Sequence, residues 1–170
     1  GARREHRGEP VQQRERLVRP GLGACRVDSG RDGGIAIACD DPVIFLEPKR
    51  QYHSDKAEVD VAATPDPLFA SRVVRRGDDV TLVAYGPMVK TCLRVAEVAE
   101  GEGHSVEVIG LGSLSPLDLA PVLDSVRRTG RVVLTHEAHL TLGLGAELSA
   151  RITKECFYSL LAPPLRVAGM

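Results

Sequence analysis

A histidine and a glutamate carry the chemistry that this sequence offers most directly. His136-Glu137 follows the apolar run Val132 to Thr135, and an imidazole beside a carboxylate is a common pair for general acid and base catalysis. Neighbouring residues on an extended chain point to opposite sides, which argues against joint action on one substrate. We therefore predict that His136 and Glu137 position a loop or form hydrogen bonds at an interface, and that they do not catalyse.

The glycine-rich turn Gly143-Leu144-Gly145 precedes a predicted helix and superficially resembles a turn that cradles phosphate. Leu148 stands where the third glycine of such a fingerprint belongs, and a long loop separates the turn from the preceding strand. Nucleotide binding is therefore the weaker interpretation. The sequence also lacks a serine elbow, a phosphate loop with lysine, and a usefully spaced carboxylate pair.

Strands that alternate with helices must position these residues. This order predicts an α/β fold with a mostly parallel sheet, right-handed crossovers and helices on both faces. Ligands and partners of such a sheet gather at the carboxyl ends of its strands. The predicted strands are Val80 to Tyr85, Val106 to Leu111, Val132 to Thr135 and Leu165 to Ala168.

Glycine, proline and serine mark the predicted helix ends. Gly86-Pro87 opens one helix, which Gly101 and Gly103 close. Ser115-Pro116-Leu117-Asp118 predicts the cap and first turn of a second helix, and a third spans Gly145 to Leu161. Helical spacing of apolar residues predicts three buried stripes, made of Met88, Cys92, Val95, Ala96 and Ala99; of Leu119, Val122, Leu123 and Val126; and of Leu148, Ile152, Cys156 and Leu160.

The first third of the chain is organised differently. Residues 1 to 34 are rich in Arg, Gly, Gln and Glu without strand or helix periodicity. This predicts either an irregular arm or a stretch that is not natural family sequence at this position. Val43 to Leu46, between two prolines, predicts a short buried strand that ends a first domain at residues 35 to 47. Residues 48 to 67 are polar and proline-rich and predict a linker, so that a second domain occupies residues 68 to 170.

The composition excludes several classes of protein. A formal net charge of -1 gives no electrostatic reason to expect nucleic acid or an anionic membrane as partner. The four cysteines lie far apart without a CxxC pair, which argues for free thiols and against a zinc site. No apolar run approaches the roughly 20 residues of a membrane span. We expect a cytoplasmic protein that has no membrane or nucleic acid as partner.

Six sequence blocks together resemble one protein family. In chain order they are AIACDDPVIFLEPKRQYH (residues 36 to 53), VVRRGDDVTLVAYGPMV, VEVIGLGSLSPLD, SVRRTGRVVLTHEA, LTLGLGAEL and CFYSLLAPPLRVAG. They are similar to the beta subunit of the decarboxylating component of 2-oxo acid dehydrogenase complexes, from about Ala36 to Gly169. Glu47-Pro48-Lys49 resembles the branched-chain enzymes more than the pyruvate enzymes.

The resemblance implies a fold, an activity and partners. Residues 68 to 170 would form a three-layer transketolase C-terminal-like domain, and residues 35 to 47 the tail of a pyrimidine-binding domain. The activity implied is oxidative decarboxylation of a 2-oxo acid with acyl transfer to lipoyl. Thiamine diphosphate and magnesium would be bound by the assembled enzyme. The implied partners are an alpha subunit, a second beta subunit and a lipoyl-bearing acyltransferase core.

The resemblance implies few site residues in this chain. Potassium would be bound by backbone carbonyls of Ala36, Cys39 and Asp41. His6 is a remote match to a family histidine near the cofactor. The family glutamate that activates thiamine diphosphate has no counterpart in the matching region, so we expect the chain alone to be inactive. The alternative is a non-catalytic remnant or subunit-interaction module of the same family.

Two glycines depart from the family pattern. Family members carry an acid and a base where this chain has Gly110 and Gly112, after the strand residues Val108 and Ile109. We expect the polar network of that loop to be lost.

Overall fold

The structure is a computed structural model that describes residues 23–25, 40, 42–48, 67 and 69–169. Two sheets occur in these residues. The smaller sheet pairs β1 (Gly23–Cys25) in parallel with β2 (Val43–Phe45). The predicted strand at Val43 is confirmed, but Ile44 is 45% exposed, so the strand is not fully buried as predicted. β1 lies within the predicted irregular arm, where the sequence reading missed a strand.

The larger sheet has five strands in the order β3-β5-β4-β6-β7. β4, β5, β6 and β7 run parallel, and β3 is antiparallel to β5 at one edge. The predicted mostly parallel sheet is therefore confirmed, with one antiparallel edge strand that was not predicted. The strands are β3 (Arg72–Arg75), β4 (Val80–Ala84), β5 (Val106–Gly110), β6 (Val132–His139) and β7 (Leu165–Gly169).

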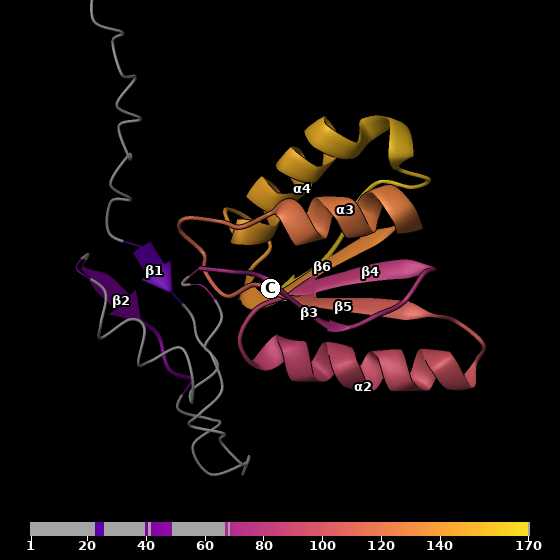
Figure 1. Cartoon of the computed structure of the whole chain (residues 1–170), viewed down its shortest axis with the longest axis horizontal. Coiled ribbons are helices and arrows are strands. Elements are labelled where there is room, and N and C mark those ends of the chain that lie inside the picture. Colours follow the sequence, from indigo (N-terminus) through magenta and orange to yellow (C-terminus); the bar gives the residue numbers. More distant parts are fainter. Residues whose placement is uncertain (1–22, 26–39, 41, 49–66, 68, 170) are drawn as a thin grey trace, which may run out of the picture.

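Helices cover both faces of this sheet, which makes three layers (Figure 1). α2 (Pro87–Gly101) lies on one face, whereas α3 (Ala120–Thr129) and α4 (Leu144–Cys156) lie on the other. The short 3-10 helix η2 (Phe157–Ser159) continues α4. Among the described residues, no helix combines the length and apolar character needed to cross a bilayer.

Alternation along the strands makes two separate cores. Val83, Ile109 and Leu134 point to the face of α3 and α4, where they pack with Val122 and Ile152. Leu82, Ala84 and Val108 point to the other face and pack against α2. The period of two along a strand therefore builds both cores from the same three central strands.

Most predicted helix stripes are confirmed, with one exception. Cys92 and Ala96 of α2 are buried, as are Val122 and Val126 of α3. Val95 was predicted to be buried but is 50% exposed. It lies on the flank of α2, beyond the part of the helix that the sheet covers.

The second helix begins later than predicted. Its first residue is Ala120, with Pro121 in the first turn, so Ser115 and Pro116 are not its cap and first position. The Asp118 carboxylate accepts hydrogen bonds from the backbone N–H of Ser71 at 2.9 Å and of Ala120 at 3.3 Å. Because Asp118 ties this loop to the segment before β3, the preceding residues stay outside the helix.

Candidate functional site

The loops at the carboxyl ends of the parallel strands form the candidate site, as the predicted fold requires. β6 runs to His139, four residues beyond the predicted end of that strand. The ladder continues because His136 pairs with Ala168 and, after an irregularity, His139 pairs with Gly169. His136 and Glu137 therefore lie inside the strand and not at the start of a loop, where they were predicted.

His136 is buried and hydrogen-bonded through both ring nitrogens. The residue is 3% exposed, and its ring stacks on Tyr85 with 5.8 Å between the ring centroids. Nδ1 donates to the carbonyl oxygen of Ala138 at 3.1 Å, and Nε2 accepts from the N–H of Gly145 at 3.1 Å. Both bonds exist together only in the tautomer that carries its proton on Nδ1. His136 thus joins β6 to the first turn of α4.

The glycines of the turn Gly143-Leu144-Gly145 are required by close packing around this ring. A Cβ on Gly145 would lie 2.5 Å from Nε2 of His136. A Cβ on Gly143 would lie 2.9 Å from Cε1 of the same ring and closer still to the carbonyl oxygen of His139. The N–H of Gly145 is already used by His136. The turn therefore holds an imidazole where a phosphate cradle would need open space, which disfavours the nucleotide interpretation.

Glu137 does not converge with His136 on one reacting atom. The residue is exposed, whereas His136 is buried. This agrees with the prediction that the two side chains point to opposite sides of an extended chain. The prediction that the pair belongs to an interface remains a prediction, and the burial of His136 limits its own part to holding the neighbouring loop.

The loop after β6 presents two leucines to solvent, a feature that the sequence reading missed. Leu140 is 42% exposed and Leu142 is 99% exposed. Leu142 also has a φ of 59°, in the left-handed region that a branched side chain rarely adopts. Arg166 donates to the carbonyl oxygen of Leu140 at 3.2 Å, and the N–H of Leu140 donates to Gly169. These bonds hold the loop in place.

Of the two glycines that depart from the family pattern, only Gly112 leaves no space for a side chain. A Cβ on Gly112 would lie 2.2 Å from the carbonyl oxygen of Ala70. The backbone before β3 therefore occupies the space of a side chain. At Gly110 the nearest atom is a methyl group of Val89 at 3.4 Å, an apolar neighbour.

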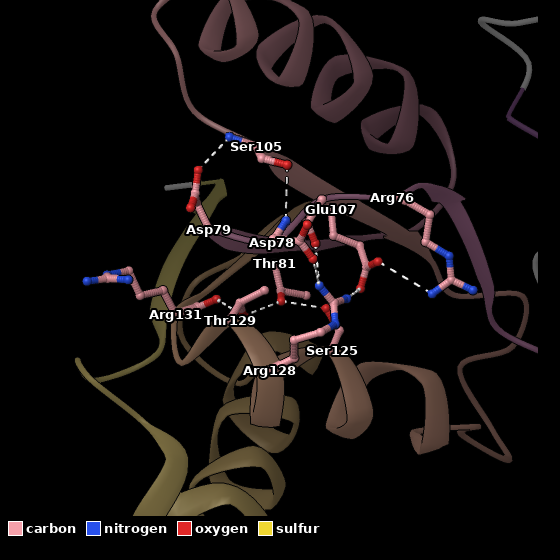
Figure 2. Close-up of polar contacts among 11 residues, drawn as sticks. Arg76, Asp78, Asp79, Thr81, Ser105, Glu107, Ser125, Arg128, Thr129 and Arg131 are labelled. Carbon is pink, nitrogen blue, oxygen red and sulfur yellow. Dashed lines mark hydrogen bonds and ion pairs between the residues drawn. The ribbon is translucent and has the colours of Figure 1, made fainter.

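The densest polar network lies at the opposite end of the sheet (Figure 2), and the sequence reading missed it. Glu107 of β5 is 1% exposed, and its Oε2 accepts from Arg128 of α3 at 2.7 Å. Arg128 also donates to the carbonyl oxygen of Gly77 at 2.6 Å and to Asp78. Oε1 of Glu107 has no hydrogen-bond partner and lies 3.6 Å from Arg76. One arginine thus joins α3, β5 and the turn before β4.

A chain of hydroxyl groups continues this network into the core. Oγ1 of Thr81 lies 2.7 Å from Oγ of Ser125 and 2.7 Å from Oγ1 of Thr129. Thr129 also donates to the carbonyl oxygen of Arg131 at 3.1 Å. All three hydroxyl-bearing residues are buried. Their mutual hydrogen bonds satisfy them, so the cluster stabilises the packing of α3 on β4 and offers no free group to a substrate.

The two described thiols are buried and unreactive. Cys92 and Cys156 are free cysteines, as predicted. Burial raises the pKa of the Cys92 thiol from 9.0 to about 11. Burial also raises the pKa of Cys156, against a smaller lowering effect of Arg127. A thiol with a raised pKa is a poor nucleophile near neutral pH.

The remaining predicted site residues lie outside the described residues. These are His6 and the potassium-binding carbonyls of Ala36, Cys39 and Asp41. Within the described ranges, no three His, Cys, Asp or Glu side chains are grouped so that they could hold a metal ion.

Comparison with known proteins shows the family to which the chain belongs. The model of the family described as "Transketolase, C-terminal domain" matches residues 70–170. The pyruvate dehydrogenase E1 component subunit beta of Leifsonia xyli is 54% identical over 134 residues, which are 79% of this chain and 40% of that protein. The 3-methyl-2-oxobutanoate dehydrogenase subunit beta of Mycobacterium tuberculosis is 50% identical over 135 residues, which are 79% of this chain and 38% of that protein.

A solved structure gives the same fold. The structure titled "Split gene transketolase, inactive beta4 tetramer" matches with a TM-score of 0.66 and 26% identity, over 88% of this chain and 48% of that chain. The predicted resemblance to beta subunits and the predicted transketolase C-terminal-like fold are both confirmed. The chain spans about two-fifths of the length of the curated relatives it matches.

Proposed function

Because the chain belongs to the transketolase C-terminal domain family, we propose that it serves as the assembly part of a 2-oxo acid dehydrogenase beta subunit. The observation that carries the proposal is the 54% identity over 134 residues to such a subunit. The described site supports it, because the carboxyl-end loops contain rigid backbone and exposed leucines and no convergent catalytic groups. The reaction served is oxidative decarboxylation of a 2-oxo acid with acyl transfer to lipoyl.

The described residues do not fit thiamine diphosphate. The turn at Gly143 and Gly145 is filled by His136, and its N–H at Gly145 is already bonded. Thiamine diphosphate and magnesium therefore belong to the proposal as ligands of the assembled enzyme, and no step through them is assigned to this chain. Potassium at the carbonyls of Ala36, Cys39 and Asp41 is part of the same proposal.

The substrate class proposed is a branched-chain 2-oxo acid. Glu47-Pro48-Lys49 supports it, as does the 50% identity to a 3-methyl-2-oxobutanoate dehydrogenase subunit. The 54% identity to a pyruvate dehydrogenase subunit makes pyruvate the competing substrate.

The partners proposed are an alpha subunit, a second beta subunit and a lipoyl-bearing acyltransferase core, in the cytoplasm. The predicted interface at Glu137 and the exposed leucines at 140 and 142 form one continuous stretch for such a contact. His136 would act behind it by fixing the backbone.

The test is decarboxylation by this chain mixed with a matching alpha subunit, thiamine diphosphate and magnesium. The substrates are 3-methyl-2-oxobutanoate and pyruvate, and a full-length beta subunit is the positive control. Faster turnover of 3-methyl-2-oxobutanoate supports the branched-chain assignment, and faster turnover of pyruvate contradicts it. Co-purification with the alpha subunit without turnover supports the alternative, a subunit-interaction module. Neither turnover nor co-purification would overturn both.

A further inference from the structure

The ring of His136 lies between β6 and α4 and accepts a hydrogen bond from the helix. Its Nε2 accepts from the N–H of Gly145, and its Nδ1 donates to the carbonyl oxygen of Ala138, both at 3.1 Å. The bond to Gly145 is buried, and a Cβ at that position would lie 2.5 Å from Nε2. The contact therefore leaves no room for a water molecule between the ring and the helix.

Protonation of this ring is incompatible with the bond to Gly145. An imidazolium carries a proton on each nitrogen, so both nitrogens are donors. Nε2–H would then face the N–H of Gly145, a donor against a donor. Turning the ring offers no remedy, because an imidazolium has no acceptor in any orientation. His136 can become charged only when Gly145 moves away from it.

The bond to Gly145 also closes one end of an exposed loop. The loop between β6 and α4 presents Leu140 at 42% and Leu142 at 99% exposure. Its first part is held at β7 by two hydrogen bonds of the Leu140 backbone. Its last part is joined to β6 by the bond between Gly145 and His136. Loss of that one bond would free the end of the loop that carries Leu142.

We propose that the segment from Leu140 to Gly145 is a proton-sensitive latch. It is closed while His136 is neutral, and it opens at the α4 end when the ring takes up a proton. The open loop no longer holds Leu142 at its left-handed φ of 59°, so acid weakens the surface that the two leucines form. This consequence rests on the proposed function, which places both leucines in a subunit contact, whereas the opening itself does not.

Titratable and charged groups lie around the ring on four strands and helices. They are Tyr85 of β4, Arg166 of β7, Glu147 of α4, and Glu137 and His139 of β6 itself. Arg166 donates to the carbonyl oxygen of Leu140, and Glu147 pairs with Arg151 at 2.7 Å. Both nitrogens of His136 bond to backbone atoms, so a proton on Nε2 has to displace Gly145 and not a side chain.

Hydrogen exchange in this chain alone tests the latch, separately from the decarboxylation assay. Between pH 8 and pH 5 the protection factor of the Gly145 N–H should fall by about tenfold or more, because opening is then coupled to proton uptake. The N–H of Gly130, which donates to Val126 at the end of α3, is the control and should keep its protection. Equal pH dependence at the two glycines overturns the proposal.

Two variants and one spectrum make the test specific. His136→Gln keeps a side-chain acceptor for Gly145 but gains no proton, so its Gly145 protection should not vary with pH. His139→Gln removes an exposed histidine of the same strand and should leave the pH dependence intact. Nitrogen NMR of the unchanged chain at pH 8 should show the ring proton on Nδ1, whether or not the variants fold. A proton on Nε2 overturns the proposal, as does a pH dependence that persists in His136→Gln or disappears in His139→Gln.

Discussion

The two faces of the five-stranded sheet, one under α3 and α4 and the other under α2 (Figure 1), differ in how many buried polar groups they contain. The face under α3 and α4 contains every buried polar cluster described above. These are Glu107 with Arg128, the hydroxyl group of Thr81 with its partners, and His136 with Gly145. The face under α2 is apolar, with a core of Leu82, Ala84, Cys92, Ala96, Val106 and Val108. It also ends in uncovered side chains on β7 and on the flank of α2.

This difference shows that a dense group of polar side chains need not be a functional site. Apart from Oε1 of Glu107, the polar clusters are hydrogen-bonded within the chain, and they connect segments that are distant in sequence. Large apolar side chains are among those exposed to solvent, including Leu142, Leu165 and Val167. The assembly role proposed above requires contact surface, and exposed apolar side chains supply it better than polar groups that are already paired within the chain.

The largest effect is expected on the face of α3 and α4. Arg128→Ala removes the close partner of Glu107, a carboxylate that is 1% exposed. An unpaired buried charge is costly, and Arg128 is itself partly exposed, so the free energy of unfolding should fall by about 3 kcal/mol. Urea denaturation followed by circular dichroism measures it.

Arg127→Ala is the matched control for this experiment. Arg127, the neighbour of Arg128 in α3, pairs with Asp124 at 3.1 Å, but the two side chains are 47% and 78% exposed. An exposed pair contributes about 0 to 1 kcal/mol. If the two alanine variants lose equal stability, the ion pair between Arg128 and buried Glu107 does not contribute as described. The buried polar groups would then not distinguish the two faces.

A second prediction tests whether α2 excludes water from Cys92 in the core beneath it. The folded chain holds the pKa of Cys92 at about 11, above the ordinary 9.0, because burial disfavours the thiolate. The contribution is complete below pH 9 and is lost as the pH rises towards 11, since the unfolded thiol ionises first. The free energy of unfolding should fall by about 2 kcal/mol over this range.

Cys92→Ala separates this thiol from the other groups that titrate at high pH. The variant should be less stable at pH 8 and should lose less stability between pH 9 and pH 11. If the free energy of unfolding falls equally with pH in the variant and the unchanged chain, water reaches Cys92. The core under α2 would then be accessible to solvent, like the edge of that face.

A third, smaller effect concerns the contact between His136 and α4. Gly145→Ala places a Cβ 2.5 Å from Nε2 of His136 and should cost roughly 1 to 2 kcal/mol, although alanine favours a helix. Gly101→Ala at the end of α2 meets nothing within 4 Å and should be neutral or stabilising. Thermal unfolding of both variants measures the difference. A stabilising Gly145→Ala would show that the loop yields easily.

The smallest effect is expected on the open flank of α2. Val98 is 64% exposed, so Val98→Lys should change the free energy of unfolding by less than about 0.5 kcal/mol. Val126→Lys, at a position with 0% exposure on α3, should prevent folding. Denaturation curves compare them. A large loss for Val98→Lys would mean that this flank is covered in the folded chain.

Sequence periodicity predicted the parts of the fold that depend on neighbours along the chain. The four parallel strands and the buried stripes of α3 and α4 are of this kind. Val95 was misplaced because spacing shows that a helix has an apolar side but not how wide a sheet lies beneath it. β3 was missed because its arginines resemble a charged loop.

The site depended on contacts that sequence spacing does not show. Asp118 bonds both to Ala120 at the start of α3 and to Ser71, 47 residues earlier, and the second contact has no signal in local spacing. Glu107 meets Arg128 across 21 residues, and a single acid in the apolar run Val106 to Ile109 was its only signal. The sequence rightly disfavoured a phosphate-binding turn at Gly143, but it could not show why the glycines are needed, because the ring that packs against them lies on β6.

The strand order also has a consequence during synthesis. β4 is the first of the parallel strands to leave the ribosome, yet it hydrogen-bonds to β5 at Val106–Gly110 and to β6 at Val132–Thr135, and the latter are made about 50 residues later. At roughly 5 to 20 residues per second, both sides of this apolar strand remain without their neighbours for several seconds. A newly made chain is therefore open to premature pairing at its central strand, in the interval when chaperones can act on it.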